Sequence, residues 1–496
     1  MPTARSHQYF PPRSVHLLHY SRALPGLLAV VLAGCAATAP PGSGVPAMAV
    51  PPAWSAAGAL AASPGDSMAT ATSLAQWWER FDDPQLSALV AQALQANITV
   101  RSAQAALQQA RAQLDVQNAG LLPNVGASAS AQRGRSGGVS ASNSFQTGFD
   151  ASWEPDVFGA QRSAIRASAA DSRAAEANLG QAQVSLAAEV AANYIALRGL
   201  QLRLDIARSN LASQQETLQI SQWRLQAGLV TSLVTEQARA ATAQTAAQVP
   251  ALEASLAQTR HALAVLTGQP PAALESALID TRPVPQAADD LALAFPADTL
   301  RQRPDVRVAE ERVAAALARV AQADAARYPD FRLSGSLGLR ALTVGALTSG
   351  SSVAQSLLAN VSGVLFDGGA ARAQVRVQEA GAEQARLSYQ DTVLTALTDV
   401  EDALVALRGD RERLVQLRIA AEAARNAALL AQDRYSSGLI DFQAVLETQR
   451  TQLATQDGVA STVTSLSTNH VRLYKALGGG WQPAEILPVP NALLAH

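Results

Sequence analysis

Two very long stretches of the chain carry apolar residues at every seventh position. The first runs from about Gln161 to Ala227 without a proline, and its positions are Leu197, Leu204, Leu211, Leu218 and Leu225. In the second stretch they are Val393, Val400, Leu407, Leu414, Ala421, Ala428 and Tyr435. A sustained heptad is typical of helices that wind around partner helices. At 1.5 Å per residue we expect each helix to extend roughly 100 Å, and Pro250 to kink the helix that follows the first.

Four short stretches instead alternate apolar and polar residues. The clearest are FQTGFDASW at 145–153 and FRLSGSLGL at 331–339, and the weaker ones are VGASASA at 125–131 and ANVSGVLF at 359–366. Period two predicts strands with one apolar and one polar face. Such strands suit a transmembrane barrel, with Gly/Ser-rich connectors at 133–142 and 341–352 as surface loops. A soluble sandwich edge is the alternative, although four strands are too few to build a sandwich or to close a barrel.

The two halves of the chain resemble each other. The stretch VRSAQAALQQARAQLDVQNAGLLPNV at 100–125 matches VRVAEERVAAALARVAQADAARYPDF at 306–331, and RLQAGLVTSL at 224–233 matches RYSSGLIDFQ at 434–443. Each half reads as a helix of about 35 residues ending at a proline, two strands, a very long helix, a glycine break and another long helix. Units of about 200 residues are far longer than solenoid repeats, so we infer duplication of one structural unit. We expect a first repeat at 73–280, a second at 281–481 and a C-terminal tail at 482–496.

The N-terminus reads as a targeting sequence. Three arginines precede a short apolar run that ends in LAGC at 32–35, and Cys35 is the only cysteine of the chain. The run is too short for a membrane-spanning helix, and its end resembles the lipobox of bacterial lipoproteins. We therefore expect 1–34 to be a lipoprotein signal peptide and Cys35 to be acylated; a coincidental cysteine after an ordinary signal peptide is the alternative. Residues 35–72 are rich in Ala, Pro, Gly and Ser, which predicts an extended tether that packs no core.

Composition and motifs argue against several functional classes. A net charge of −2 and a sequence pI of about 6.3 indicate no basic surface for nucleic acid. The single cysteine excludes an intrachain disulfide. His261, His470 and His496 are isolated, and the other three histidines fall within the expected signal peptide, so no metal site is indicated. Nucleophile-elbow, phosphate-loop and His-Glu-x-x-His motifs are absent, so we expect no enzyme and no cofactor apart from the covalent lipid on Cys35.

Six short motifs are spread over residues 77–481. They are WWERFDDPQL (77–86), WEPDVFG (153–159), LTGQPP (266–271), RQRPDVRVAEERV (301–313), LFDGG (365–369) and LYKALGGGW (473–481). In this order they resemble the TolC-type outer-membrane factors, most closely the OprM/NodT-like lipoprotein branch. The resemblance implies a fold that is mainly α with membrane β. In such a homotrimer each protomer gives four strands to a 12-stranded outer-membrane barrel and long coiled-coil helices to a periplasmic tunnel.

The resemblance also implies a function and partners. Members of this family are passive gated exit ducts of tripartite efflux pumps for drugs or other small molecules. They work with a periplasmic membrane-fusion adaptor and an inner-membrane resistance–nodulation–division pump. Ala36, which follows the cysteine, resembles the residue of lipoproteins sorted to the outer membrane, so we expect a lipid-anchored, barrel-inserted protein there that extends into the periplasm. Two alternatives stay open: the duct of a type I protein-secretion system, and a structural envelope lipoprotein without a pore.

The glycine breaks between the long helices are the first candidate site. Glycine permits a tight reversal and the close approach of another backbone. By resemblance, the breaks at Gly228 and Leu229 and at Gly438 and Leu439 are the tips that dock the adaptor. The alternative is that these glycines only turn the chain.

Beyond each break, a glutamate and an arginine three residues apart lie on one helix face, as Glu236 with Arg239 and as Glu447 with Arg450. The resemblance places Glu447 and Arg450 in a closed periplasmic gate held by carboxylates and by ion pairs between protomers. Gln443 occupies a position that is often an apolar constriction in the family. An ordinary solvated ion pair is the alternative for both pairs.

Overall fold

The structure is a computed structural model, and it describes residues 51–55, 74–135, 137, 140–287 and 300–482, all within the compact unit Val45–His496. Cys35, the expected signal peptide and nearly all of the C-terminal tail lie outside these residues. The described chain is mainly helical with one four-stranded sheet, so the expected fold class is confirmed. Within this part of the chain, no helix combines the length and hydropathy needed to cross a bilayer.

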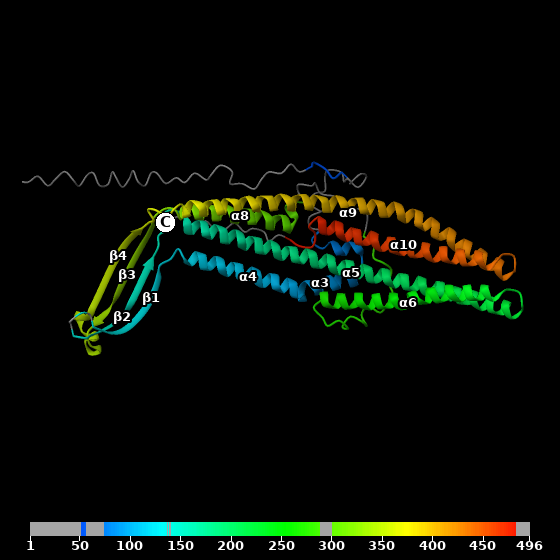
Figure 1. The fold of residues 1–496 in the computed structure, drawn as a ribbon, viewed down its shortest axis with the longest axis horizontal. Helices are drawn as coiled ribbons and strands as arrows, with labels where there is room; N and C mark the ends of the chain where they lie inside the picture. Colours follow the sequence, from blue (N-terminus) through cyan, green and yellow to red (C-terminus); the bar gives the residue numbers. More distant parts are fainter. Residues whose placement is uncertain (1–50, 56–73, 136, 138–139, 288–299, 483–496) are drawn as a thin grey trace, which may run out of the picture. The chain divides into compact units, whose positions relative to one another are not determined.

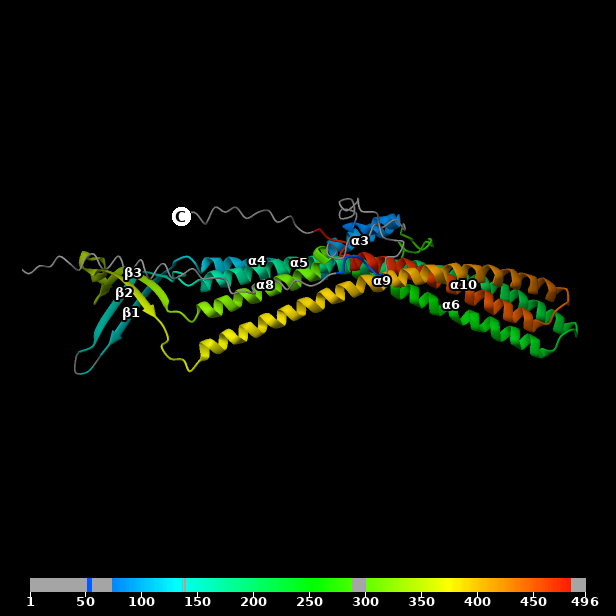
Figure 2. The same cartoon turned by 90° about the horizontal axis from the view of Figure 1, so that it is seen from above.

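Two long helices dominate the structure. Helices α5 (Ala160–Gln226) and α9 (Ala370–Ser436) have 67 residues each, and the return helices α6 (Ser232–Leu266) and α10 (Phe442–Ala476) have 35 each. Figures 1 and 2 show α6 beside the distal part of α5 and α10 beside that of α9. Helix α6 continues through Pro250, so this proline does not end it.

The expected heptads form buried seams along only part of the helices. On α9 the seam is buried at all seven positions except Ala421, which is half-buried. On α5 the seam is buried at Leu197 and Leu204, half-buried further on, and 36% exposed at Leu225. Polar side chains take over the buried face of α5 in this distal part: Asn210, Gln214, Thr217 and Ser221. The distal seam of the first hairpin is therefore polar, which the leucine spacing did not predict.

The predicted length of about 35 residues for the helix before the strands is wrong in both halves. In the first half the chain divides into α3 (Pro84–Ala96) and α4 (Ile98–Ala119) at Asn97. The Asn97 side chain accepts from the Thr99 amide at 2.8 Å and donates to the Leu266 carbonyl at 2.9 Å, so it caps a new helix and ties it to the end of α6. In the second half α8 (Pro304–Ala325) has only 22 residues, because proline starts it.

The sheet is antiparallel in the order β1 (Asn124–Gly134), β2 (Ser142–Trp153), β3 (Asp330–Ala341) and β4 (Val353–Ser362). Three strands lie where the alternation predicts them. The fourth was predicted at 359–366 but begins at Val353, because it pairs with β3 from Leu339↔Val353 to Asp330↔Ser362. Two short 3-10 turns, η3 (Val344–Thr348) and η4 (Gly350–Ser352), precede it. Within the described chain, the outer edges of β1 and β4 pair with no further strand.

The main core lies where the helices of the two halves meet. Trp77, in η2 (Trp77–Phe81), stacks on Tyr474 with ring centroids 5.2 Å apart. Trp54 is buried in the same core, and the Ser55 amide donates to Glu401 Oε1 at 2.7 Å. The stretch expected to be a coreless tether thus contains a docked anchor, because an indole buries a large apolar area even in a Pro-rich segment.

The helical hairpins of the two halves match each other at a constant offset. Helices α5 and α9 both span 67 residues and begin 210 positions apart, at Ala160 and Ala370. Helices α6 and α10 begin at Ser232 and Phe442, again 210 positions apart. Every residue of the first helical hairpin therefore has an equivalent in the second.

Candidate functional site

Both glycine breaks are helix C-caps with the same hydrogen bonds. At the first tip, the Gly228 amide donates to the Leu225 carbonyl at 2.9 Å and the Leu229 amide to the Arg224 carbonyl at 2.8 Å. At the second tip, Gly438 donates to Tyr435 at 2.9 Å and Leu439 to Arg434 at 2.8 Å. The φ angles of Gly228 and Gly438, 74° and 77°, are left-handed and favour glycine. The chain thus reverses identically at the two tips.

Each reversal exposes a leucine side chain. Leu229 is 69% exposed and Leu439 is 74% exposed, at the same position of the two turns. Each leucine follows the glycine of its turn and precedes a half-buried apolar residue, Val230 or Ile440, so it forms an apolar knob at the tip. Such a knob, held by a rigid cap, can insert into a groove on another helix.

The first tip holds the second through Arg224. Its guanidinium carbon lies 4.6 Å from the centroid of the Tyr435 ring, and its Nη1 donates to the Tyr435 carbonyl at 2.8 Å. A Cβ placed on Gly438 would lie 3.2 Å from Arg224 Nη2, so glycine leaves the room that the guanidinium uses. The sequence comparison of the halves aligned Arg224 with Arg434 but did not indicate that either contacts the other tip.

The contact between the two hairpins continues along α5 and α10 as hydrogen bonds. Gln449 Nε2 donates to Thr217 Oγ1 at 3.0 Å, and Asn210 Nδ2 donates to Gln456 Oε1 at 2.8 Å. Further along, Arg203 pairs with Asp457 at 2.6 Å. These residues were missed by the sequence analysis, because polar residues within a helical heptad look like solvated positions until the partner helix is known.

The two Glu–Arg pairs differ more than their spacing suggests. Glu236 and Arg239 form an ion pair at 2.9 Å, and both side chains are exposed. Glu447 and Arg450 are also exposed, but they form no ion pair with each other or with another described residue. At the 210-residue offset Glu236 is equivalent to Leu446, not to Glu447. The pairs are thus one residue out of register, about 100° apart around equivalent helices.

The exposed pair on α10 keeps its side chains available for another molecule. Gln443 is likewise exposed, in the first turn of α10, whose N-cap Asp441 accepts from the Ala444 amide at 3.1 Å. The structure therefore groups Gln443, Glu447 and Arg450 on one stretch of α10 beside the second tip, with no contact among the three charged or polar ends within the described chain.

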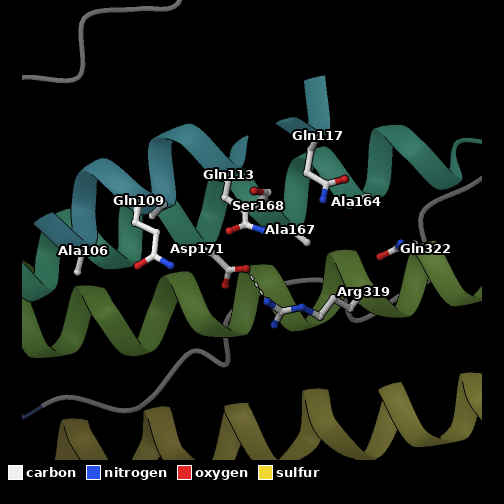
Figure 3. A pocket seen from close by; sticks show the side chains of 11 residues that line it. Ala106, Gln109, Gln113, Gln117, Ala164, Ala167, Ser168, Asp171, Arg319 and Gln322 are labelled. Carbon is white, nitrogen blue, oxygen red and sulfur yellow. Dashed lines mark hydrogen bonds and ion pairs between the residues drawn. The ribbon is translucent and has the colours of Figure 1, made fainter. Parts of the chain in front are cut away.

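A polar hollow of about 470 Å³ lies between α4, α5 and α8 (Figure 3). Gln109, Gln113 and Gln117 line it from α4, and Asp171 of α5 pairs with Arg319 of α8 across it at 2.5 Å. Its lining residues include no His, Cys or Lys. Across the described residues, no group of three or more His, Cys, Asp and Glu side chains could hold a metal ion.

Comparisons with known proteins agree on one family. The family model described as "Outer membrane efflux protein" matches residues 89–269 and 295–479. Nodulation protein T of Rhizobium leguminosarum bv. viciae is 31% identical over 411 residues, covering 83% of this chain and 85% of that protein. The pyoverdine export outer membrane protein OpmQ of Pseudomonas putida is 33% identical over 471 residues, covering 92% of this chain and 96% of that protein.

The fold leads to the same group. The solved structure of the outer-membrane channel OprN superposes with a TM-score of 0.79 at 38% identity, covering 89% of this chain and all of that one. The chain belongs to the outer membrane efflux protein family.

Proposed function

We propose that this chain is the outer-membrane exit duct of a tripartite efflux pump, a passive gated channel for drugs or other small molecules. The observation that carries the proposal is the open sheet. Its strands present apolar side chains on one face, among them Phe149, Leu337 and Leu357, all more than half exposed. Lipid can cover such a face, whereas the unpaired edges of β1 and β4 require further strands, because a bilayer offers backbone groups no hydrogen bonds.

Helix α9 supports closure by further copies of the chain. Six of its eight exposed large apolar residues lie at intervals of 4, 7, 10 and 11, which places them within about 80° of one another around the helix: Leu387, Leu394, Val405, Val415, Ile419 and Leu430. An unpartnered apolar stripe of this length on an edge helix needs a neighbour. Three copies, each giving four strands, would close a 12-stranded barrel and cover the stripe, so the protein acts as a homotrimer.

The remaining parts of the proposal concern partners and placement. The exposed Leu229 and Leu439 at the tips dock a periplasmic membrane-fusion adaptor, which joins the duct to a resistance–nodulation–division pump in the inner membrane. A lipid on Cys35 anchors the mature chain in the outer membrane, and residues 73–280 and 281–481 act as two repeats of one unit. The name of the relative OpmQ, which refers to pyoverdine export, supports a small-molecule cargo. No catalytic step is assigned to the chain.

The first test is the mass and conductance of the full-length protein, purified in detergent from a Gram-negative host. We expect a particle of three chains that forms ion-conducting pores in planar bilayers. A monomer, or a trimer that never conducts, would contradict the duct and favour a structural lipoprotein. Cargo is tested by the drug susceptibility of a host that lacks its own duct, with and without the pump and adaptor.

We further propose that Glu447, Arg450 and Gln443 line the closed periplasmic gate, because all three are exposed near the second tip. Replacing Glu447 and Arg450 with alanine together should raise the resting conductance, since the charges that hold neighbouring protomers together are lost. The control is the same double change at Glu236 and Arg239, which sit on a different helix face and should leave the resting conductance unchanged. Equal conductance of the gate variant and the parent would reject the gate but not the duct.

A further inference from the structure

Repetition of the hairpins identifies a contact that one copy of the chain leaves incomplete. Within a copy, α5 of the first hairpin packs against α10 of the second. The equivalents of these helices are α9 and α6, at the offset of 210 residues. If copies continue the same arrangement around a ring, α9 of one copy packs against α6 of the next.

At the tips, one copy of the chain has both the arginine and the acceptor that such a contact between copies needs. Arg224 lies against the Tyr435 ring, donates to its carbonyl and fills the space beside Gly438. The equivalent arginine is Arg434, whose side chain is exposed and has no partner among the described residues of its own copy. The equivalent acceptor is the Leu225 carbonyl, beside Gly228. A Cβ on Gly228 would meet nothing within 4 Å, so the space that Arg224 fills at the second tip is open at the first.

We propose that Arg434 clasps the first tip of the neighbouring copy by donating to the carbonyl of the partner subunit's Leu225. The inference rests on the proposed function, which supplies the second copy. The carbonyls of Leu225 and Tyr435 each accept from the glycine amide of their turn. A carbonyl oxygen has two lone pairs and can accept a second bond, as the Tyr435 carbonyl does from Arg224. The clasp between copies therefore repeats a contact that the fold makes once within each copy, and six such clasps close the ring of a trimer.

A second observation on the same helix face points to a neighbouring copy. Gly199 of α5 touches Thr464 of α10 so closely that a Cβ on the glycine would overlap the threonine side chain. Its equivalent, Gly409 of α9, has nothing within 4 Å and is exposed, although glycine inside a helix costs about 1 kcal/mol relative to alanine. The residue equivalent to Thr464 is the partner subunit's Ala254, in α6 of the next copy. Gly409 would allow α6 to approach α9 closely there, as Gly199 allows α10 to approach α5.

The rest of the seam changes character between the two interfaces. The hydrogen-bonded residues Asn210, Thr217 and Gln456 have alanines as equivalents: Ala420, Ala427 and Ala246. Gln449, the fourth of these residues, has Arg239 as its equivalent, so the seam between copies keeps few of the hydrogen bonds that the seam within a copy has. The Arg434 clasp is a polar contact that fixes its register, because a charged donor aimed at a carbonyl has a narrow geometry.

Cysteine cross-linking tests the clasp directly. Leu225→Cys with Arg434→Cys, treated in isolated membranes with a short bismaleimide reagent, should give linked dimers and trimers on a denaturing gel. Arg224→Cys with Tyr435→Cys should react within one copy and run as a monomer. The parent chain, treated in the same way, controls for Cys35. Monomers only from the first pair, in a protein whose native mass is that of a trimer, would overturn the clasp and leave the duct standing. A monomeric parent particle would overturn the proposed function and the clasp with it.

A stability readout covers the case in which the cysteine pair does not assemble. Arg434→Ala should lower the temperature at which the trimer dissociates in detergent, and Arg434→Lys should restore part of the loss, since lysine keeps a charged donor. Arg224→Ala, which breaks the clasp within a copy, should affect dissociation less than Arg434→Ala. Equal dissociation temperatures for Arg434→Ala and the parent would contradict the inference.

Discussion

At the scale of single residues, some glycines serve close packing and others serve turns. Gly180 lies inside α5, where a Cβ would overlap the Trp481 ring. That indole also donates to the Gln302 carbonyl at 3.1 Å, so the aromatic end of the last motif is seated on the glycine. The motif LYKALGGGW was recognisable in the sequence, but its contact with a glycine about 300 positions earlier was not, because nothing local encodes a partner so distant in the chain.

We expect Gly180→Ala to destabilise the folded chain by about 1–3 kcal/mol, because overpacking against the indole outweighs the helix propensity gained. In a Trp481→Ala background the same change should be neutral or stabilising, since the ring that it would strike is gone. Thermal unfolding of the four variants of this cycle measures the coupling. The same loss of stability in both backgrounds would show that Trp481 is not the obstacle.

A second residue-scale feature is the buried phenol of Tyr194. Its hydroxyl donates to Asp83 Oδ2 at 2.8 Å and accepts from Arg198 Nη2 at 3.1 Å, and Arg198 is itself fully buried. Burial raises the pKa of Tyr194 to about 12 from the ordinary value of 10.0, against the lowering effect of Arg198. The folded chain therefore holds this proton more tightly than the unfolded chain does.

The sign of the pH dependence follows from that difference. Between about pH 10 and pH 12 the unfolded chain loses the proton and the folded chain keeps it, so this group should make stability fall as pH rises through the window. Tyr194→Phe removes the titrating hydroxyl and should flatten that part of the profile. Chemical unfolding of both proteins from pH 9 to pH 12 is the measurement, and parallel profiles would exclude Tyr194 as the source.

At the scale of elements, Arg303 joins three helices. It precedes α8 and pairs with Asp305 at 2.6 Å, with Asp399 of α9 at 3.0 Å, and with the Ala476 carbonyl of α10 at 3.0 Å. Burial by itself would lower the pKa of Arg303, but the hydrogen bonds and charges of the two aspartates raise it. The guanidinium thus stays charged and fixes the start of α8 to both helices of the second hairpin.

Replacing Arg303 with alanine should cost about 1–3 kcal/mol, because several hydrogen bonds are lost, whereas the remaining Asp305 and Asp399 are partly exposed and can be solvated. Arg301→Ala, at an exposed arginine two positions earlier, should change stability by less than about 0.5 kcal/mol. Denaturant unfolding of both variants gives the comparison. Similar losses at the two positions would mean that the aspartates find other partners.

Element types were predictable, and several element boundaries were not. Helix α5 begins and ends within one residue of the predicted limits, because a glycine stands on either side of an uninterrupted helical stretch. The break at Asn97 depends on its bond to Leu266, and the start of β4 depends on pairing with β3. Both partners lie elsewhere in the chain, so local spacing could not indicate them.

At the scale of the whole molecule, the exposed stripe on α9 links the fold to assembly. Leu430→Glu should prevent or weaken trimer formation, because burying an unpaired carboxylate in an apolar interface costs several kcal/mol. Each copy should still fold, since Leu430 is exposed within it. Leu430→Met keeps an apolar side chain of similar volume and should assemble normally. The mass of the detergent-purified particles distinguishes these outcomes, and a trimer from Leu430→Glu would place this position outside the interface.

As with the elements, some features of the candidate sites could be predicted from residue spacing, and others required the contacts of the folded chain. The turns at Gly228 and Gly438 followed from residue type, and the structure has them as matching helix caps. The likeness of the two Glu–Arg pairs was misleading, because a one-residue difference in register is invisible without the helix starts. Docking and gating at these sites remain predictions.

The sequence by itself determined the kinds of elements, their order, their duplication and the family. These depend on periodicity, turn residues and short motifs, which are local and can be read from residues that are neighbours in the sequence. Only the tertiary structure decided that Trp54 anchors the Pro-rich segment, that Arg224 holds the second tip, and that Arg434 is left exposed at the equivalent place. Such facts join residues hundreds of positions apart, and packing free energy, not local preference, selects those pairs.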